Sequence, residues 1–130
     1  MKAVQGVLVD TSVWVDHFRH HNSALVALLG LDMAMTHPMV VAELVCGTPP
    51  APRVQTLADI GRLQQTRLAT LPEVMALIER EKLYGLGCGL VDLLLLASVL
   101  ITPGVALWTL DKRLAGLAAR FGVQYRAVSH

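Results

Sequence analysis

The 130 residues are expected to form a single α/β domain with a mostly parallel sheet of four or five strands. Short apolar runs alternate along the chain with longer segments that begin at helix-capping residues, as in a parallel α/β fold. The first run, Val4–Val9, has no polar alternation, which is typical of a parallel strand buried on both faces. A chain of 130 residues has room for one hydrophobic core, so residues 1–130 are assigned to one domain.

The first half of the chain keeps this alternation and includes a proline-rich loop. Ser12 is expected to cap a helix over Val13–Phe18, and Asn22 or Ser23 is expected to cap the next helix. The other elements predicted here are a helix over Ala24–Leu29, a strand over Met33–Thr36, a helix over Pro38–Cys46, a loop over Thr48–Pro52, a polar helix over Arg53–Gln65 and a weak strand over Arg67–Thr70.

The second half is arranged around the most apolar helix of the chain. Its predicted elements are a helix over Glu73–Leu83, a flexible break over Gly85–Gly89, the apolar helix over Val91–Leu100, a strand over Val105–Thr109, a helix over Asp111–Phe121 and a last strand over Val123–Val128. The chain has more apolar residues than one small core needs, which indicates a buried partner surface. We expect Val91–Leu100 to supply a homodimer face.

Composition excludes several classes of protein. Hydrophobic residues make up 54% and charged residues 16%, which is the opposite of the balance found in disordered chains. The longest apolar run, Leu93–Ile101, is too short to span a membrane, and Asp10 interrupts the N-terminal apolar stretch that a signal peptide requires. A cytoplasmic protein with reduced thiols at Cys46 and Cys88 is therefore expected. The net charge of +1 does not by itself indicate a nucleic-acid-binding domain.

Four acidic residues stand apart from the others because apolar residues surround them. Asp10 and Asp111 follow predicted strands, whereas Glu43 and Asp92 lie within apolar helical segments. An ionised carboxylate beside core residues is costly unless something compensates its charge. In a parallel α/β sheet, compensation is found in the crevice at the carboxyl ends of the strands. We therefore expect the four carboxylates to converge at that edge.

Converging carboxylates repel one another unless a cation lies between them. Oxygen ligands without Cys or His favour a hard cation, Mg²⁺ or Mn²⁺. Such an ion activates a bound water and neutralises charge during phosphoryl transfer. The acids therefore predict metal-dependent hydrolysis of phosphodiester bonds, with one set of residues as metal ligands and catalytic groups: Asp10, Glu43, Asp92 and Asp111.

Simpler roles stay open for three of these acids. Asp10, Asp92 and Asp111 each fit the position of a helix cap, whereas Glu43 in mid-helix has no capping task. Core packing or an exposed helix end accounts for the other conspicuous side chains, namely Trp14, Trp108, His17, His20 and His21.

The segments around the four acids share the pattern of a known family. They are Leu8-Val9-Asp10-Thr11-Ser12, His37-Pro38-Met39-Val40-Val41-Ala42-Glu43-Leu44, Gly89-Leu90-Val91-Asp92-Leu93 and Thr109-Leu110-Asp111-Lys112. In order and spacing they resemble the PIN domain, in particular VapC-type toxins of bacterial toxin–antitoxin pairs. One departure concerns the places after the fourth acid, where many relatives carry a further acid and an aromatic. Here those places hold Arg113, Leu114 and Ala115.

The resemblance implies a PIN-like three-layer α/β/α fold and a Mg²⁺- or Mn²⁺-dependent endoribonuclease, the toxic component of a type II toxin–antitoxin system. It also implies an RNA substrate, a VapB-like antitoxin, a homodimer, and a heterotetramer or larger assembly with the antitoxin. Ser12 and Thr109 would support the acidic site through hydroxyl hydrogen bonds. Three nearby cations are candidates for contacts with RNA phosphates: Arg19, Lys112 and Arg113.

Two other interpretations belong to different classes. The first is a PIN-like binding module that engages a partner protein or RNA without cleaving it, which the intact set of four acids disfavours. The second is a phosphatase with Asp10 as nucleophile. That chemistry requires a second aspartate two residues later, where this chain has Ser12.

Overall fold

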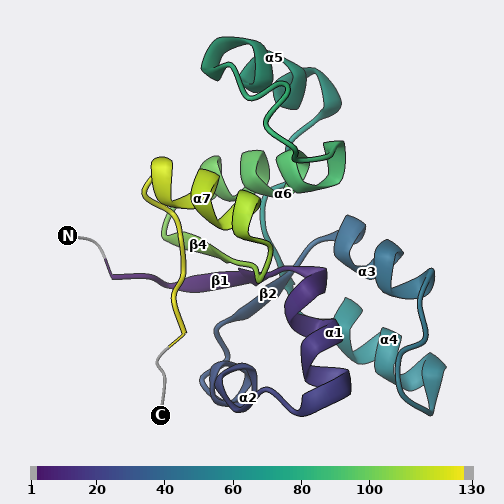
Figure 1. Ribbon diagram of the computed structural model, residues 1–130. Coiled ribbons are helices and arrows are strands. Elements are labelled where there is room, and N and C mark those ends of the chain that lie inside the picture. Colours follow the sequence, from purple (N-terminus) through teal and green to yellow (C-terminus); the bar gives the residue numbers. More distant parts are fainter. Residues whose placement is uncertain (1–2, 128–130) are drawn as a thin grey trace.

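Four parallel strands form the centre of the computed structural model, which describes residues 3–127 (Figure 1). The strands are β1 (Gly6–Val9), β2 (Ala34–Thr36), β3 (Gln64–Gln65) and β4 (Val105–Trp108). Their order in the sheet is β3-β2-β1-β4, and each neighbouring pair is parallel. The predicted α/β class is therefore confirmed. All four residues of β1 are buried, as expected for a central strand covered on both faces.

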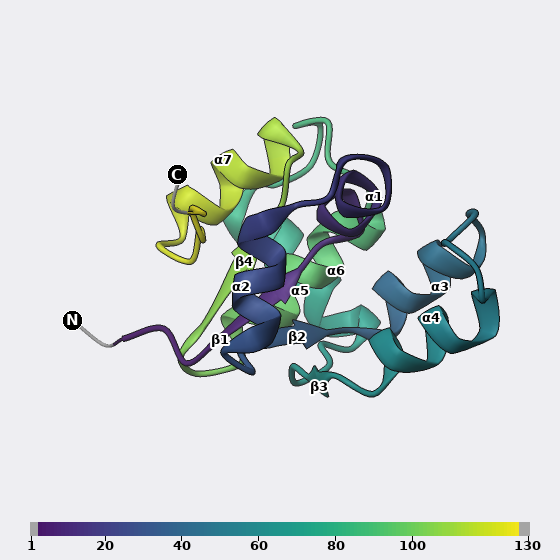
Figure 2. The same cartoon turned by 90° about the horizontal axis from the view of Figure 1, so that it is seen from below.

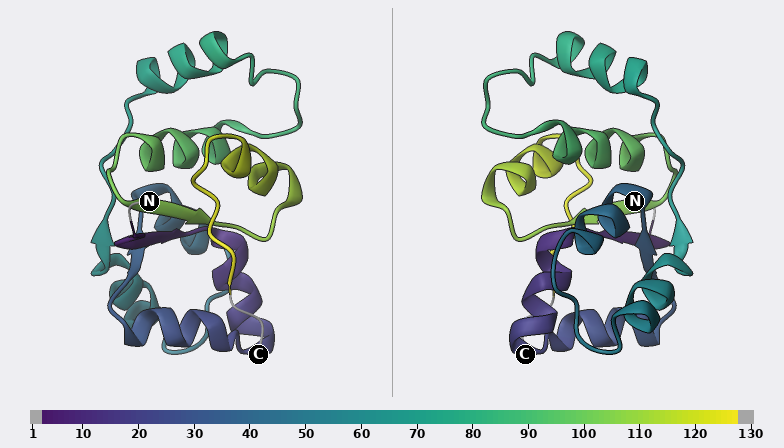
Figure 3. Two further views of the ribbon diagram at one scale, coloured as in Figure 1. Left: turned by 90° about the vertical axis from the view of Figure 1, so that its left-hand side faces the viewer. Right: turned by 90° about the vertical axis from the view of Figure 1, so that its right-hand side faces the viewer.

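Helices cover both faces of this sheet. They are α1 (Thr11–His20), α2 (Ser23–Gly30), α3 (Pro38–Val45), α4 (Arg53–Gly61), α5 (Leu71–Glu81), α6 (Leu90–Leu100) and α7 (Lys112–Arg120). In Figure 3, α6 and α7 lie above the sheet with α5 outside them, and α1 and α2 lie below it. The three-layer α/β/α arrangement that the family resemblance implies is thus confirmed.

The order of the strands reverses at β1, and this places a topological switch point in the sheet. From β1 the chain crosses to β2 on one side, and β4 pairs with β1 on the other, so a topological switch point lies between β1 and β4. Open α/β sheets form their binding crevices at such a point. Figure 2 shows α3 and α4 as a pair of helices that extends beyond this edge. The crevice is therefore bordered by strand ends and by α3.

Several predicted boundaries are wrong for identifiable reasons. The polar helix ends at Gly61 rather than Gln65, and the strand predicted over Arg67–Thr70 is replaced by the two-residue β3. The backbone N–H groups of Arg67 and Ala69 donate to side-chain hydroxyls of Thr102 and Ser98 instead of joining a sheet. Tertiary contacts with α6 and the segment after it therefore take up the hydrogen bonds that a strand would have used.

The last predicted strand is also reduced. Within residues 3–127, the segment after α7 forms a single bridge between Gln124 and Leu107, and Val128 lies outside the described residues. The helix predicted to begin after Ser12 begins at Thr11, so Asp10 occupies the N-cap position. Asn22 caps α2 as predicted, by accepting a hydrogen bond from the backbone N–H of Leu25.

The apolar helix α6 fills the core of this single chain. Its buried residues include Leu93 and Leu95–Val99, which pack within the hydrophobic core, and Leu90 at its start is 53% exposed. The surface expected to form a homodimer is thus largely covered by the chain itself. Among residues 3–127, no helix combines the length and apolar character needed to cross a membrane. Trp14 and Trp108 lie in the core as predicted.

Candidate active site

Asp10 is fixed at the end of β1 by two hydroxyl groups. Its carboxylate oxygen Oδ2 accepts hydrogen bonds from Ser12 Oγ and Thr109 Oγ1, each at 2.7 Å, and the residue is 5% exposed. This carboxylate makes no capping bond to α1, although Asp10 holds the N-cap position. The simpler interpretation of Asp10 as a helix cap is therefore wrong. These two hydrogen bonds hold the buried carboxylate in one orientation.

The same two hydroxyls tie Asp10 to the chain after β4. Ser12 Oγ accepts from the backbone N–H of Leu110 at 3.0 Å, and Thr109 Oγ1 accepts from that of Asp111 at 3.1 Å. Because β1 and β4 are paired neighbours, their carboxyl ends bring these residues together. The structure thus places Ser12 and Thr109 against Asp10, where hydroxyl support was expected.

Asp111 caps a helix and also lies at the edge of the sheet where the acids are found. Its Oδ1 accepts from the backbone N–H of Leu114 at 2.9 Å, which makes Asp111 the N-cap of α7. The side chain is exposed, so its second carboxylate oxygen can face the crevice. The capping interpretation is confirmed for Asp111, and it does not remove the residue from the acidic edge.

Glu43 approaches the site from α3. Its Oε1 accepts from the hydroxyl of Thr11 at 2.7 Å, which links α3 to the start of α1. Glu43 and Thr11 line a cavity of about 300 Å³ between these helices, which Arg19 also borders. Glu43 is exposed, so solvent reaches its carboxylate. Thr11 is a contact that sequence reasoning did not assign, although it directly follows Asp10.

Asp92 connects the acids electrostatically. It lies in the first turn of α6, where Gly89 rather than Asp92 is the N-cap. Partial burial raises the pKa of Asp92, and the charges of Asp10, Asp111 and Glu43 raise it further, against a lowering hydrogen bond from the Gly89 backbone. All four predicted acids therefore contribute to one electrostatic environment at the carboxyl edge. Asp92 is not the N-cap residue of α6, but it accepts a hydrogen bond from the Gly89 backbone, so the capping interpretation is confirmed in part.

The acids fit a hydrated hard cation better than a closed metal cage. Within the described part of the chain, no three Asp, Glu, His or Cys side chains lie close enough together to hold an ion by themselves. Mg²⁺ usually keeps several waters and binds through only one or two carboxylates, so this spacing suits it. The oxygen donors and the mutual repulsion at Asp92 both favour a small divalent cation.

Arg113 lies near the four acids, and its guanidinium contacts the backbone of Gly87. Its Nη1 donates to the carbonyl of Gly87 at 3.4 Å, and a Cβ at Gly87 would lie 2.6 Å from the same nitrogen. Gly87 has φ +88°, a left-handed conformation that favours glycine. Burial raises the pKa of Cys88, and the charges of Asp92 and Asp111 raise it further, whereas the charge of Arg113 lowers it. Because Cys88 is close enough to feel all three charges, the guanidinium of Arg113 lies near these acids.

The other predicted cations and the histidines lie around the site. Arg19 is exposed near the end of α1, and Lys112 is exposed as the first residue of α7. His17 Nδ1 accepts from the backbone N–H of Asn22 at 3.0 Å, which closes the end of α1. Exposed His20 and His21 follow it, so the predicted histidine-rich helix end is confirmed.

The parallel sheet, its layers of helices and the acid-lined carboxyl edge define a PIN-like domain. The PIN domain family matches residues 7–120 of this chain. Ribonuclease VapC32 of Mycobacterium tuberculosis, from strain CDC 1551 / Oshkosh and from strain ATCC 25618 / H37Rv, is 44% identical over 117 residues. The match covers 90% of this chain and 94% of each relative. The chain therefore belongs to the PIN-domain family and, within it, to the VapC-type ribonucleases.

Proposed function

We propose that this chain is a Mg²⁺- or Mn²⁺-dependent endoribonuclease and the toxic component of a type II toxin–antitoxin pair. The observation that carries the proposal is the shared electrostatic environment of Asp10, Glu43, Asp92 and Asp111 at the switch point of the sheet. The similarity to Ribonuclease VapC32 supports RNA as the substrate.

In this proposal one or two of the four acids bind the ion directly and the others bind it through its water ligands, with Asp10 as the most rigid ligand. Ser12 and Thr109 fix Asp10 Oδ2, so the carboxylate does not have to reorganise when the ion binds. When bound, the ion would supply a water of lowered pKa and offset the negative charge that develops on the phosphate. The chemistry that the ion would supply is attack of this water on the phosphorus opposite the leaving oxygen, which would break the phosphodiester bond.

The exposed cations around the acids have the complementary task of holding RNA. Arg113 is kept in place by Gly87, and Arg19 borders the cavity next to Glu43. Lys112 precedes Arg113 at the start of α7. Phosphate contacts of this kind position the backbone without reading its bases. They would also offset the repulsion between the acids and the substrate.

An antitoxin partner fits the groove beside α1. The cavity near Glu43 and a second cavity of about 340 Å³ share Phe18 and Pro50, so they adjoin along this helix. Trp14 lines the second cavity, and its buried indole N–H has no acceptor among residues 3–127. We propose that a VapB-like antitoxin places an apolar segment in this groove and covers the acids. The toxin would form a homodimer and, with the antitoxin, a heterotetramer or larger assembly in the cytoplasm.

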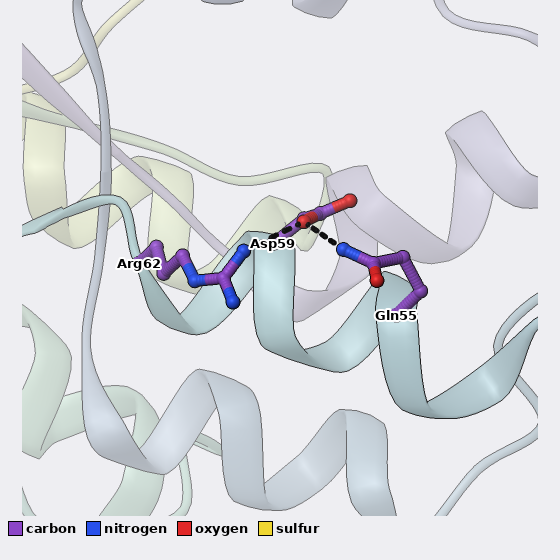
Figure 4. A network of polar contacts seen from close by, with 3 residues as sticks. All are labelled: Gln55, Asp59 and Arg62. Atoms are coloured by element: carbon purple, nitrogen blue, oxygen red, sulfur yellow. Dashed lines mark hydrogen bonds and ion pairs between the residues drawn. The ribbon is translucent and has the colours of Figure 1, made fainter.

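Cleavage of single-stranded RNA by the purified protein tests the proposed activity. We expect cleavage with Mn²⁺ or Mg²⁺, none after addition of EDTA, and none with Asp10→Ala. Asp59→Asn is the matched control, because Asp59 is exposed on α4 and its carboxylate makes its polar contacts with Gln55 and Arg62, away from the acids (Figure 4). Cleavage that survives both EDTA and Asp10→Ala would contradict the metal site. RNA binding without cleavage under all conditions would favour the binding module.

Co-expression with a VapB-like antitoxin tests the partner proposal. We expect a complex that no longer cleaves RNA, with its assembly measured by light scattering. Val15→Glu should weaken the complex, because Val15 lines the groove, whereas Met75→Glu on exposed α5 should not. Equal binding by both variants would contradict the assigned groove, and a strictly monomeric free protein would contradict the homodimer.

A further inference from the structure

A buried hydrogen bond joins the start of α3 to α6. His37 is 3% exposed and Ser98 is 0% exposed, and His37 Nε2 lies 3.1 Å from Ser98 Oγ. His37 Nδ1 accepts from the backbone N–H of Met39 at 3.0 Å, which makes His37 the N-cap of α3. A neutral imidazole has one donor nitrogen, so Nε2 carries the proton and donates to Ser98. Burial lowers the pKa of His37, in agreement with the neutral ring.

The Ser98 hydroxyl is fully used by this network. It accepts from His37 Nε2 and from the backbone N–H of Ala69 at 3.1 Å, and it donates to the carbonyl of Leu94 at 2.8 Å. A serine hydroxyl has one donor and two acceptor positions, and all three are occupied. One side chain of α6 therefore holds both the start of α3 and the segment that follows β3.

These two helices carry two of the four acids. Glu43 follows His37 by six residues, and Asp92 precedes Ser98 by six, so each acid lies about 9 Å along its helix from the hydrogen bond. Two carboxylates of like charge repel each other, so their separation depends on how the two helices are held. An attachment between the helices is needed to hold these acids at a fixed separation.

Direct packing provides little of that attachment. Within residues 3–127, α3 packs mainly against α4 and α1, whereas α6 packs against α5, β4 and α7. The two helices share the hydrophobic core but pack mainly on different neighbours, and the hydrogen bond between His37 and Ser98 joins them directly. A displacement of about 1 Å in a catalytic group can lower a rate about a hundredfold, so this bond can influence the site from a distance.

We propose that His37 and Ser98 are positioning residues, whose hydrogen bond sets the separation between Glu43 and Asp92 and thereby the affinity of the site for its cation. The inference rests on the proposed metal-dependent function. It assigns His37 a task in addition to capping α3. A residue that only caps the helix would affect folding without changing the cation affinity of the folded protein.

Two variants separate these roles. His37→Asn keeps a side-chain oxygen that can cap α3, because asparagine is a preferred N-cap residue, but its side chain is too short to reach Ser98. Ser98→Ala removes the other partner of the bond. Thr102→Val is the matched control: Thr102 donates to the Ser98 carbonyl at 2.7 Å and accepts from the Arg67 N–H at 3.0 Å. Thr102 therefore joins the end of α6 to the segment after β3, as Ser98 also does, but it makes no hydrogen bond to α3.

The measurement is Mn²⁺ binding to the cation-free protein, followed by electron paramagnetic resonance of the free ion, with chemical unfolding in parallel. We expect His37→Asn and Ser98→Ala to weaken Mn²⁺ binding about tenfold, in the range seen for residues that orient ligands. Thr102→Val should lower stability and leave the Mn²⁺ affinity within about twofold of wild type. RNA cleavage by the two positioning variants should be rescued in part by high Mn²⁺.

Three outcomes would overturn the inference. Mn²⁺ binding by His37→Asn that equals wild type would remove the positioning role, even if Ser98→Ala fails to fold. An equal loss of affinity in Thr102→Val would assign the effect to general destabilisation. Both results would leave the proposed function intact, because wild type would still bind the ion. If wild type itself binds no Mn²⁺, the proposed function and this inference both fail.

Discussion

The strand side and the helix side of the acidic edge are built differently. On the strand side, Asp10 is buried and held by the hydroxyls of Ser12 and Thr109. On the helix side, Glu43 is exposed with one hydroxyl contact from Thr11, and Asp92 is only partly buried. The strand side is fixed by neighbouring paired strands, whereas the helix side depends on how separate helices pack. Substitutions on the two sides should therefore affect folding and activity in different proportions.

Removal of the Glu43 charge should greatly reduce RNA cleavage while it leaves the free energy of unfolding almost unchanged. In Glu43→Gln, the amide oxygen can still accept from Thr11, and the side chain is exposed, so we expect stability within about 0.5 kcal/mol of wild type. RNA cleavage should fall about a hundredfold because one ligand charge is lost. Cleavage assays and chemical unfolding measure the two effects. Glu79→Gln on exposed α5 is the control, and unchanged cleavage in Glu43→Gln would exclude this acid from the site.

Loss of a hydroxyl on the strand side should affect folding and activity together. Thr109→Val removes the bond to Asp10 Oδ2 and the acceptor for the Asp111 N–H. We expect a loss of about 1–3 kcal/mol in the free energy of unfolding, as for hydrogen bonds to charged groups. Cleavage should fall about tenfold because Asp10 is less well oriented. A stability equal to wild type would show that these hydroxyls do not hold Asp10.

Relief of repulsion on the helix side should stabilise the cation-free protein. Asp92 is opposed by Asp10, Asp111 and Glu43, and an asparagine can still accept the hydrogen bond from the Gly89 backbone. Asp92→Asn should therefore raise the free energy of unfolding by about 0.5–1 kcal/mol in EDTA, while it abolishes cleavage. Thermal unfolding with and without Mg²⁺ is the measurement. A destabilised variant would indicate that Asp92 is not in conflict with the other acids.

Mild acid should produce the smallest effect, through two histidines. Burial lowers the pKa of His37, and burial together with His21 lowers the pKa of His17. The unfolded chain takes up protons near pH 6.5, before these rings do so in the fold, so stability should fall as pH drops from about 7.5 to 5.5. Unfolding curves at the two pH values measure this loss, and His37→Asn should reduce it. A loss of the same size in the variant would assign the effect to other groups.

The two sides also differ in how far the sequence predicts them. The placement of Asp10 and Asp111 after apolar runs is enough to predict their meeting, because parallel strands end at one edge of the sheet. The contact between Thr11 and Glu43 and the bond between His37 and Ser98 join residues 32 and 61 positions apart. Local patterns carry no information on such pairs. The prediction of a weak strand over Arg67–Thr70 is wrong for the same reason. Hydroxyl groups of α6 and of the segment after it accept the backbone hydrogen bonds that a neighbouring strand would have accepted.

The α/β class, the central buried strand and the four acids in apolar surroundings all follow from the order of the amino acids. These features follow from local periodicity and from the cost of burying charge, which act over a few residues. The hydroxyl bonds to Asp10 and the cap that Asp111 makes on α7 became evident from the folded arrangement of the chain. The apolar residues of α6 fill the core rather than a free face. Hydrogen-bond partners are chosen by proximity in the folded chain, and that proximity arises from packing across the whole sheet.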